Sequence, residues 1–365
     1  MKGKERSEFG MKTGLFYVNE CHDGNHERAY GEMMEQIQYA EELGFESVWL
    51  AEHHFNEYGS MPSPQVAAAA ISQVTKKMDI GIGISILNFD NPVRIAEDYA
   101  MVDILSNGRL KFGGGRGYQP HEAKGLGVSM EKTREKYWEY VEIIQGLWAN
   151  DTFSYNGEFY QFENLKLTPK PLQKRIPFYH ACISPASFDL MVEKEVEEFM
   201  VTPTLMVMDD VLTYTKKTRD RLVEKGINPS IHLNLQMNIA DNTDQAIKNV
   251  EREMHVYFNR VLDIIPGAKG SQAPETYERF AEVAKEMEGP LDIAGLNQTG
   301  VALLANAPEA INRLEKAEEA GIDSLSCWFR MGGMEHRKVM RAMKRYADEV
   351  LPYFKAVRRR QKVSQ

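Results

Sequence analysis

The chain lacks the features that mark several classes of protein. It has only three cysteines among 365 residues, and they lie far apart. This argues against a disulfide framework and favours a reducing cytoplasm. No apolar run approaches the roughly 18–20 residues of a membrane span, and residues 1–10 lack the apolar core of a signal peptide. The net charge of -9 disfavours nucleic acid and anionic membranes as partners. We therefore expect a cytoplasmic protein that acts on small molecules.

Strand-like and helix-like segments alternate along most of the chain. Each run rich in β-branched and aromatic residues is followed by a stretch with apolar residues at helical spacing. Eight such repeats predict an α/β protein, a (β/α)8 TIM barrel with insertions. A doubly wound open sheet is the alternative, and the count of eight and the lack of an interdomain linker favour the barrel. The expected strands are residues 12–18, 46–50, 79–87, 109–114, 178–182, 199–202, 230–238 and 323–329.

Two segments interrupt this alternation inside a single predicted domain that spans residues 11–355. Residues 151–171 alternate around an Asn-Gly pair, which predicts a β-hairpin insertion. Residues 260–299 are rich in proline and glycine, and an excursion of this length is typical of a lid. We expect residues 1–10 to be a disordered leader and residues 356–365 to be a solvated basic tail.

In such a barrel the chemistry gathers where the strands end. The second strand ends in Glu52-His53-His54, a carboxylate and two imidazoles suited to general base work. A capped strand end with a structural histidine is the alternative on these residues alone. Glycines at 81 and 83 in the third strand indicate either a close backbone approach or a tight bend. His22 and His26 lack further metal ligands nearby, so no metal is expected.

Arg116 and the start of the following helix suggest an anion site. Arg116 follows a glycine run whose spacing does not match a dinucleotide fingerprint. Ser184-Pro185-Ala186-Ser187 stands where the next helix begins, which would leave free N–H groups and two outward hydroxyls. Helix capping alone would also explain Ser184 and Pro185. A phosphate could be held by one guanidinium and a helix N-terminus.

Several motifs occur in the same order as in a known family. They are concentrated in residues 45–64 (with Ala-Glu-His-His-Phe), 91–118 (with Gly-Gly-Gly-Arg-Gly) and 317–352. Across about residues 11–355 the chain resembles the bacterial luciferase-like flavin monooxygenases, and among them the luciferase (alkanal monooxygenase) α subunits.

The resemblance implies a TIM barrel that binds reduced FMN (FMNH2) at the carboxyl ends of its strands. The flavin would react with O2 to give a C4a-hydroperoxide that oxygenates a small organic substrate, with an aldehyde as one candidate. A separate flavin reductase would supply the FMNH2, and two barrels would pair as a homodimer or heterodimer.

The resemblance also implies roles for eight residues. His53 falls on the catalytic histidine, a general base near the flavin, with His54 as its supporting neighbour. Arg116 falls on the arginine that holds the FMN phosphate. The remaining positions are the hydroxyl ligands Ser184 and Ser187, the non-proline cis peptide Gly83-Ile84, and the ring or ribityl positions Tyr118 and Thr202.

Three departures from the luciferase α pattern count against light emission and a long-chain aldehyde substrate. Gly115 replaces a reactive cysteine, Ile183 replaces a glutamate, and Asn306-Ala307-Pro308-Glu309 replaces Gly-Thr-Pro-Glu. Two other functions stay open on this barrel. One is a non-catalytic partner subunit, although such subunits lack the long insertion, and the other is an F420-dependent oxidoreductase, which transfers hydride without activating O2.

Overall fold

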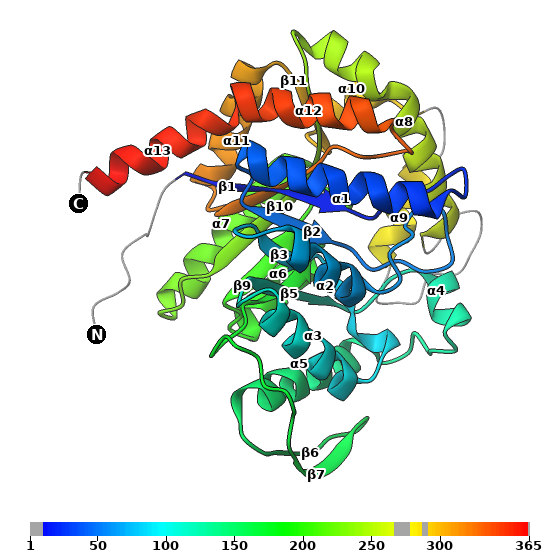
Figure 1. Ribbon diagram of the computed structural model, residues 1–365, viewed down its shortest axis with the longest axis vertical. Helices are drawn as coiled ribbons and strands as arrows, with labels where there is room; N and C mark the ends of the chain where they lie inside the picture. The colour runs from blue at the N-terminus through cyan, green and yellow to red at the C-terminus, as the bar shows by residue number, and fades with distance from the viewer. Residues whose placement is uncertain (1–9, 266–277, 287–290, 364–365) are drawn as a thin grey trace.

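Parallel strands form a closed barrel in the computed structural model, which describes residues 10–265, 278–286 and 291–363. Each strand pairs with the next, and β10 joins β9 to β12 to complete the ring (Figure 1). The (β/α)8 TIM barrel predicted from the sequence is confirmed, and all eight expected strands are present. They are β1 (Lys12–Tyr17), β2 (Ser47–Leu50), β3 (Asp79–Ile82), β5 (Leu110–Gly115), β8 (Phe178–Cys182), β9 (Glu198–Val201), β10 (Ser230–Ile239) and β12 (Ser324–Trp328).

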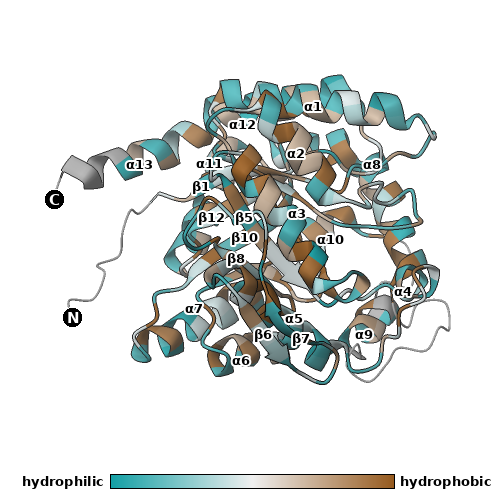
Figure 2. Ribbon diagram, turned by 60° about the horizontal axis from the view of Figure 1, so that its bottom comes forward, coloured by the Kyte–Doolittle hydropathy of each residue, from teal (hydrophilic) through white to brown (hydrophobic). Residues whose placement is uncertain are grey.

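Helices surround the barrel and bury one face each. Figure 2 shows hydrophilic residues on the outward surfaces of α1 and α12, as expected of amphipathic helices that pack on a sheet. Proline opens α2, α3, α6 and α11, where its missing N–H costs nothing. The helices are α1 (His26–Leu43), α2 (Pro64–Val74), α3 (Pro92–Leu105), α5 (Thr133–Ala149), α6 (Pro185–Glu193), α7 (Met208–Glu224), α8 (Thr243–Ile264), α11 (Ala307–Glu319) and α12 (His336–Glu349).

Tight packing in the barrel core explains one of the two strand glycines. Gly81 lies in β3 beside Trp49 of β2, and the two residues are register partners. A β-carbon on Gly81 would collide with the Trp49 indole ring. Gly81 therefore makes room for a neighbouring aromatic side chain rather than for a bend or a ligand.

Three short elements were not expected from the sequence. The segment expected as one third strand divides into β3 and β4 (Ser85–Ile86), which is followed by a 3₁₀ turn. A short helix, α4 (Pro120–Gly125), follows β5. A further parallel strand, β11 (Ala302–Ala305), pairs with the carboxyl end of β10. Because β10 is 10 residues long, it pairs with β9 near its start and with β11 near its end.

The predicted hairpin is present, but its turn lies later than expected. The reversal runs from Gly157 to Tyr160, whose ends share a backbone hydrogen bond of 2.9 Å. The carboxylate of Glu139 on α5 accepts the N–H groups of Glu158, Phe159 and Tyr160. A tertiary contact therefore moves the turn away from the Asn-Gly pair. Figure 1 shows the hairpin projecting beyond the barrel as the antiparallel strands β6 (Phe153–Asn156) and β7 (Gln161–Leu165).

The long excursion and the tail contain more helix than expected. Helix α8 continues to Ile264, and the excursion also holds α9 (Glu278–Glu286) and α10 (Ile293–Gln298). The rest of the excursion, residues 266–277 and 287–290, and the leader at 1–9 lie outside the described residues. Where a solvated tail was predicted, α13 (Leu351–Val363) continues the chain. Its Arg358 forms two 2.7 Å contacts with the Glu46 carboxylate. Among the described residues no helix combines the length and the apolarity needed to cross a bilayer.

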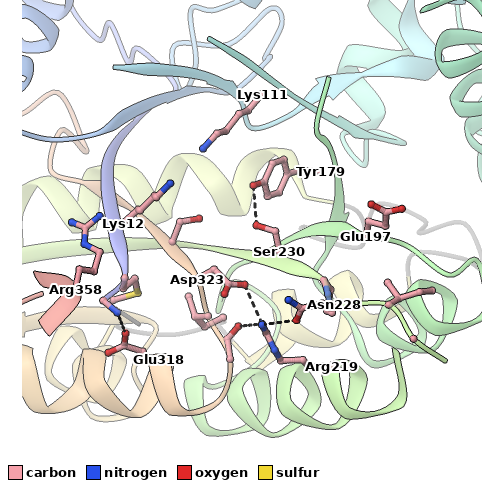
Figure 3. A pocket seen from close by; sticks show the side chains of 18 residues that line it. Lys12, Lys111, Tyr179, Glu197, Arg219, Asn228, Ser230, Glu318, Asp323 and Arg358 are labelled. Atoms are coloured by element: carbon pink, nitrogen blue, oxygen red, sulfur yellow. Dashed lines mark hydrogen bonds and ion pairs between the residues drawn. The ribbon is translucent and has the colours of Figure 1, made fainter. Parts of the chain in front are cut away.

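Two cavities of similar volume open at opposite ends of the barrel. The upper cavity, of about 580 Å³, lies at the carboxyl ends of the strands. The lower cavity, of about 550 Å³, lies at their amino ends, where Lys12, Ser230 and Ser324 begin their strands. Figure 3 shows the lower cavity, with Lys111 and Tyr179 on one side and Arg219 and Asp323 on the other.

Candidate functional site

The upper cavity brings together the eight residues to which the resemblance assigned catalysis or flavin binding. They come from the ends of five different strands, as is usual for sites in this fold. The lower cavity contains none of them. The residues of this set that line the upper cavity are His53, Gly83, Ile84, Arg116, Tyr118, Ser184, Ser187 and Thr202.

His53 is held by a carboxylate that the sequence reasoning missed. Its Nδ1 lies 3.1 Å from Oε1 of Glu122, which is fully buried on α4. The same oxygen accepts the backbone N–H of His54 at 2.8 Å. Pro120 followed by an acidic residue is a helix-start signal that could have located α4. Only the fold shows that the carboxylate of this helix reaches His53.

His54 supports the site in a different way from the one expected. Its Nε2 lies 3.0 Å from Oε1 of Glu52, not against His53. Burial opposes the charged imidazole, but the hydrogen bond and charge of Glu52 raise the pKa of His54 overall. The other Glu52 oxygen accepts the Ser85 hydroxyl and the Ile86 N–H at 2.8 and 2.9 Å. His54 thus helps Glu52 to fasten the β4 segment beside the cavity.

The Gly83-Ile84 segment lines the cavity. Its peptide bond is cis, as the resemblance implied. The Gly83 N–H donates to Leu50 O at 2.7 Å, and the Ile84 carbonyl accepts the Glu52 N–H at 3.1 Å. A β-carbon at Gly115 would lie 2.5 Å from Cδ1 of Ile84. A cysteine at position 115 would therefore require Ile84 to move.

Positive charge gathers at one end of the cavity. Arg116 follows β5, and its carbonyl accepts a 3.0 Å hydrogen bond from the Asn88 side chain. Burial raises the pKa of the Tyr137 phenol, and the nearby charge of Arg116 opposes this shift. Helix α6 begins at Pro185 with Ser184 as its N-cap. A guanidinium and a helix N-terminus thus line the same cavity, which favours an anionic group there.

The hydroxyl groups of the two serines at this helix start differ in how many hydrogen bonds they make within the chain. The Ser187 hydroxyl oxygen accepts the N–H groups of Ile183 and Ser184 at 3.1 and 2.9 Å. Its own hydrogen goes to the Ser184 carbonyl at 2.6 Å. The expectation of two outward hydroxyls is therefore wrong for Ser187, which closes the first turn of α6. The Ser184 hydroxyl makes a longer contact of 3.3 Å with the Ser187 oxygen.

Helix α9 of the excursion lies against the cavity. Its Phe280 stacks on Tyr118, with ring centroids 4.6 Å apart and ring planes 18° from parallel. Nε of Arg279 donates to the Leu205 carbonyl at 3.0 Å, which attaches the helix to the segment after β9. Phe280, Val283 and Thr202 all line the cavity. The excursion therefore supplies part of the cavity wall.

Aromatic rings that were not predicted also line the cavity. His53 contacts Tyr58 at a centroid distance of 4.7 Å, and Tyr58 contacts Tyr257 at 5.5 Å. Tyr257 in turn meets Trp328 at 4.9 Å. Burial raises the pKa values of Tyr58 and Tyr257, so both phenols stay neutral. Such a wall excludes water from the space beside His53.

A family model described as luciferase-like monooxygenase matches residues 11–324, which is most of the chain. The chain belongs to the luciferase-like monooxygenase family. It is therefore an oxidoreductase, and the resemblance found in its motifs is confirmed.

Two curated relatives cover most of the chain. The oxygenase component of flavin-dependent trigonelline monooxygenase from Acinetobacter baylyi is 29% identical over 89% of this chain and 90% of the relative. The alkanal monooxygenase alpha chain from the Kryptophanaron alfredi symbiont is 24% identical over 87% of this chain and 91% of its own.

Solved structures repeat the fold at low sequence identity. The monooxygenase RslO1 from Streptomyces bottropensis has a TM-score of 0.79 at 23% identity, covering 94% of this chain and 100% of that one. The oxygenating constituent of 3,6-diketocamphane monooxygenase from Pseudomonas putida, in complex with FMN, has a TM-score of 0.75 at 18% identity, covering 94% and 98%. An F420-dependent secondary alcohol dehydrogenase scores 0.71 at 17%, covering 93% and 98%. These likenesses show the fold alone.

In this luciferase-like chain the cavity has two chemically distinct ends. One end offers positive charge, and the other offers a histidine–carboxylate pair beside aromatic rings. Within the described ranges no three His, Cys, Asp or Glu side chains are placed to hold a metal ion. The arrangement suits an elongated ligand with an anionic group at one end and a reacting group at the other.

Proposed function

We propose that this chain is the oxygenase component of a two-component flavin-dependent monooxygenase. It would take FMNH2 from a separate reductase and use O2 to add one oxygen atom to a small organic molecule. One observation carries the proposal, namely that all eight residues assigned by the resemblance line one cavity. The name of the Acinetobacter relative, an oxygenase component, supports a reductase partner.

The cavity fits FMN in size, charge and shape. Its volume of about 580 Å³ is within the usual range for small-molecule and cofactor sites. Arg116 and the start of α6 would hold the phosphate, with the Ser184 hydroxyl beside them. The Gly83-Ile84 segment, which lines the cavity, would lie against the flavin ring. Tyr118 and Thr202 would contact the ring or ribityl chain.

The residues of the chain then have separate tasks. When bound, the reduced flavin would supply the electrons that activate O2. His53 would act as the general base beside it. Tyr58, Tyr257 and Trp328 would keep water from the reacting centre, which a reactive oxygen species requires. Phe280 and Val283 of α9 would close the cavity, as proposed for a lid.

The substrate is proposed only as a class. The apolar aromatic wall favours a small, largely apolar molecule, and an aldehyde is one candidate, given the alkanal monooxygenase relatives. Two of the departures found in the sequence, Gly115 and Ile183, line or adjoin the cavity. They count against the long-chain aldehyde and light emission of luciferase itself.

We also propose that two barrels pair through α2 and α3. Val66, Met101, Ile104 and Leu105 on these helices are exposed large apolar side chains. Burying them against a second barrel would remove this apolar surface from water. All three cysteines are buried and unpaired, which fits a cytoplasmic location.

Titration with FMNH2 under anaerobic conditions, followed by mixing with O2, tests the function. Binding followed by O2 consumption and oxygenation of a compound from an aldehyde and small-molecule screen would support it. A chain with no affinity for FMNH2 would instead be a non-catalytic subunit. Substrate oxidation with F420 and no O2 consumption would identify a hydride-transferring enzyme.

A further inference from the structure

The buried carboxylate of Glu122 needs hydrogen-bond donors as its partners. Its side chain is fully buried, and the described residues offer no hydrogen bond to its Oε2. Its Oε1 lies 2.8 Å from the His54 N–H and 3.1 Å from Nδ1 of His53. A buried ionised carboxylate is costly unless donors surround it. Both contacts must therefore be donors.

This requirement fixes the tautomer of His53. An ionised carboxylate can only accept hydrogen bonds, so Nδ1 must carry the hydrogen. In a neutral imidazole the other nitrogen, Nε2, is then an acceptor. His53 lines the cavity, and none of the described residues hydrogen-bonds its Nε2. The lone pair that a general base needs is thus kept for a molecule in the cavity.

Gln119 adds a second constraint on the same ring nitrogen. One end of its carboxamide lies 3.3 Å from Nδ1 of His53 and 3.2 Å from the Tyr118 hydroxyl. If that end were the NH2 group, it would face the hydrogen on Nδ1. The other end has no partner among the described residues. A half-turn of the amide resolves the conflict, because its oxygen can then accept from Tyr118 and share the single Nδ1 hydrogen with Glu122.

We propose that Glu122, with Gln119, is the positioning residue that holds His53 with its hydrogen on Nδ1 and Nε2 open to the cavity. The use of Nε2 as a base rests on the proposed function, whereas the tautomer is a property of the chain alone. Glu122 acts through His53 and does not touch the substrate. Among the other titratable groups, Tyr58 contacts the His53 ring and the Tyr118 hydroxyl contacts the Gln119 carboxamide.

The tautomer can be observed directly. In protein labelled with 15N-histidine, nitrogen chemical shifts in alkaline buffer distinguish a protonated Nδ1 from a protonated Nε2, and a His53→Ala variant assigns the signals. We expect wild-type His53 to carry its hydrogen on Nδ1. Glu122→Gln should weaken that preference, because a neutral amide oxygen is a weaker acceptor for the Nδ1 hydrogen than a carboxylate oxygen. Glu122→Asp should restore it in part.

Glu139→Gln is the matched control. Glu139 is also a buried carboxylate that accepts backbone N–H groups, but it serves the hairpin. Its variant should lose stability and leave the His53 signals unchanged. Gln119→Leu, which changes no charge, should shift the tautomer less than Glu122→Gln does, and it replaces that variant if Glu122→Gln fails to fold.

The proposal is overturned if wild-type His53 carries its hydrogen on Nε2, or if Glu122→Gln leaves the nitrogen signals as in wild type. FMN titration of the same samples, followed by flavin fluorescence, separates this result from the proposed function. A wild-type chain without FMN affinity would defeat the proposed function while the nitrogen spectrum still decides the role of Glu122. We expect Glu122→Gln to keep FMN affinity within about twofold, since no contact from Glu122 reaches the phosphate end.

Discussion

The two cavities of the barrel have almost the same volume but differ in how their polar groups are used. In the lower cavity, Arg219 binds Asp323 at 3.0 Å and the Gly321 carbonyl at 2.6 Å. Lys111 pairs with Asp79 at 2.6 Å. These groups satisfy one another and tie strand ends and loops together. The lower face thus serves the stability that is expected at the amino ends of barrel strands.

In the upper cavity, polar and aromatic side chains from the ends of five strands line one space. A positive end and a histidine with an open nitrogen share the space with aromatic rings. The comparison teaches that cavity size does not identify a site. What separates the two cavities is the set of residues that line them, since the upper one contains all eight residues assigned by the resemblance and the lower one contains none.

The largest expected effect in this comparison concerns His53. His53→Ala removes the proposed base, so oxygenation of an accepted substrate should slow by about 10²- to 10⁴-fold. FMN affinity should change less than the rate, because the proposal assigns the phosphate to Arg116 and the start of α6 rather than to His53. Rates with saturating FMNH2, together with a flavin titration, test this prediction. Wild-type turnover in the variant would show that the base has been assigned wrongly.

Arg116→Ala should weaken FMN binding by about 10- to 100-fold, the loss expected for a charge-assisted hydrogen bond. Fluorescence titration measures the affinity, and urea unfolding measures stability. Arg116→Lys is the conservative control and should recover part of the affinity. An unchanged affinity in Arg116→Ala would remove the upper cavity as the phosphate site.

Arg219→Ala tests the opposite end of the barrel. Its guanidinium is largely buried and has three partners, so its loss should lower the free energy of unfolding by about 3 kcal/mol. FMN affinity should stay as in wild type, which urea unfolding and titration would show together. A loss of affinity without a loss of stability would mean that the lower cavity also binds a ligand.

Ser187→Ala should have a smaller, mainly structural effect. The Ser187 hydroxyl closes the first turn of α6, so its removal should cost about 1 kcal/mol of stability. FMN affinity should fall only a few-fold, because Ser184 and the N–H groups of the helix remain. Ser184→Ala is the comparison, and a greater loss of affinity there would identify Ser184 as the phosphate ligand.

The smallest effect is a pH dependence near the upper cavity. Glu52 raises the folded-state pKa of His54 against the opposing effect of burial. The protonated His54 therefore stabilises the folded protein. This stabilisation is complete below the pKa of His54 in the unfolded chain, about 6.5, and is lost as the pH rises through the higher pKa of His54 in the folded protein. The free energy of unfolding of wild type should therefore exceed that of His54→Asn by most in mildly acidic buffer, and this difference should shrink toward pH ~8. Urea unfolding across this range checks it, and a constant difference would contradict it.

Much of the barrel could be read from local patterns. Buried strands such as β8 and amphipathic helices such as α1 have strong periodicity, so their type and place were predicted. The short strand β11 follows a long irregular segment and is stabilised by pairing with the end of β10. The hairpin turn is set by Glu139, which lies on another element. Local sequence does not contain these pairings.

For the site, the sequence by itself predicted which residues meet at one cavity. His53, Arg116 and the Ser184–Ser187 helix start follow strands, and parallel strands in a barrel all end on one face. Only the tertiary structure decided how these groups are used. It brings Glu122 to His53, directs His54 to Glu52 and turns Ser187 back on its own helix. Each of these hydrogen bonds, whether it joins distant residues or near neighbours, depends on atomic positions that the whole folded barrel fixes.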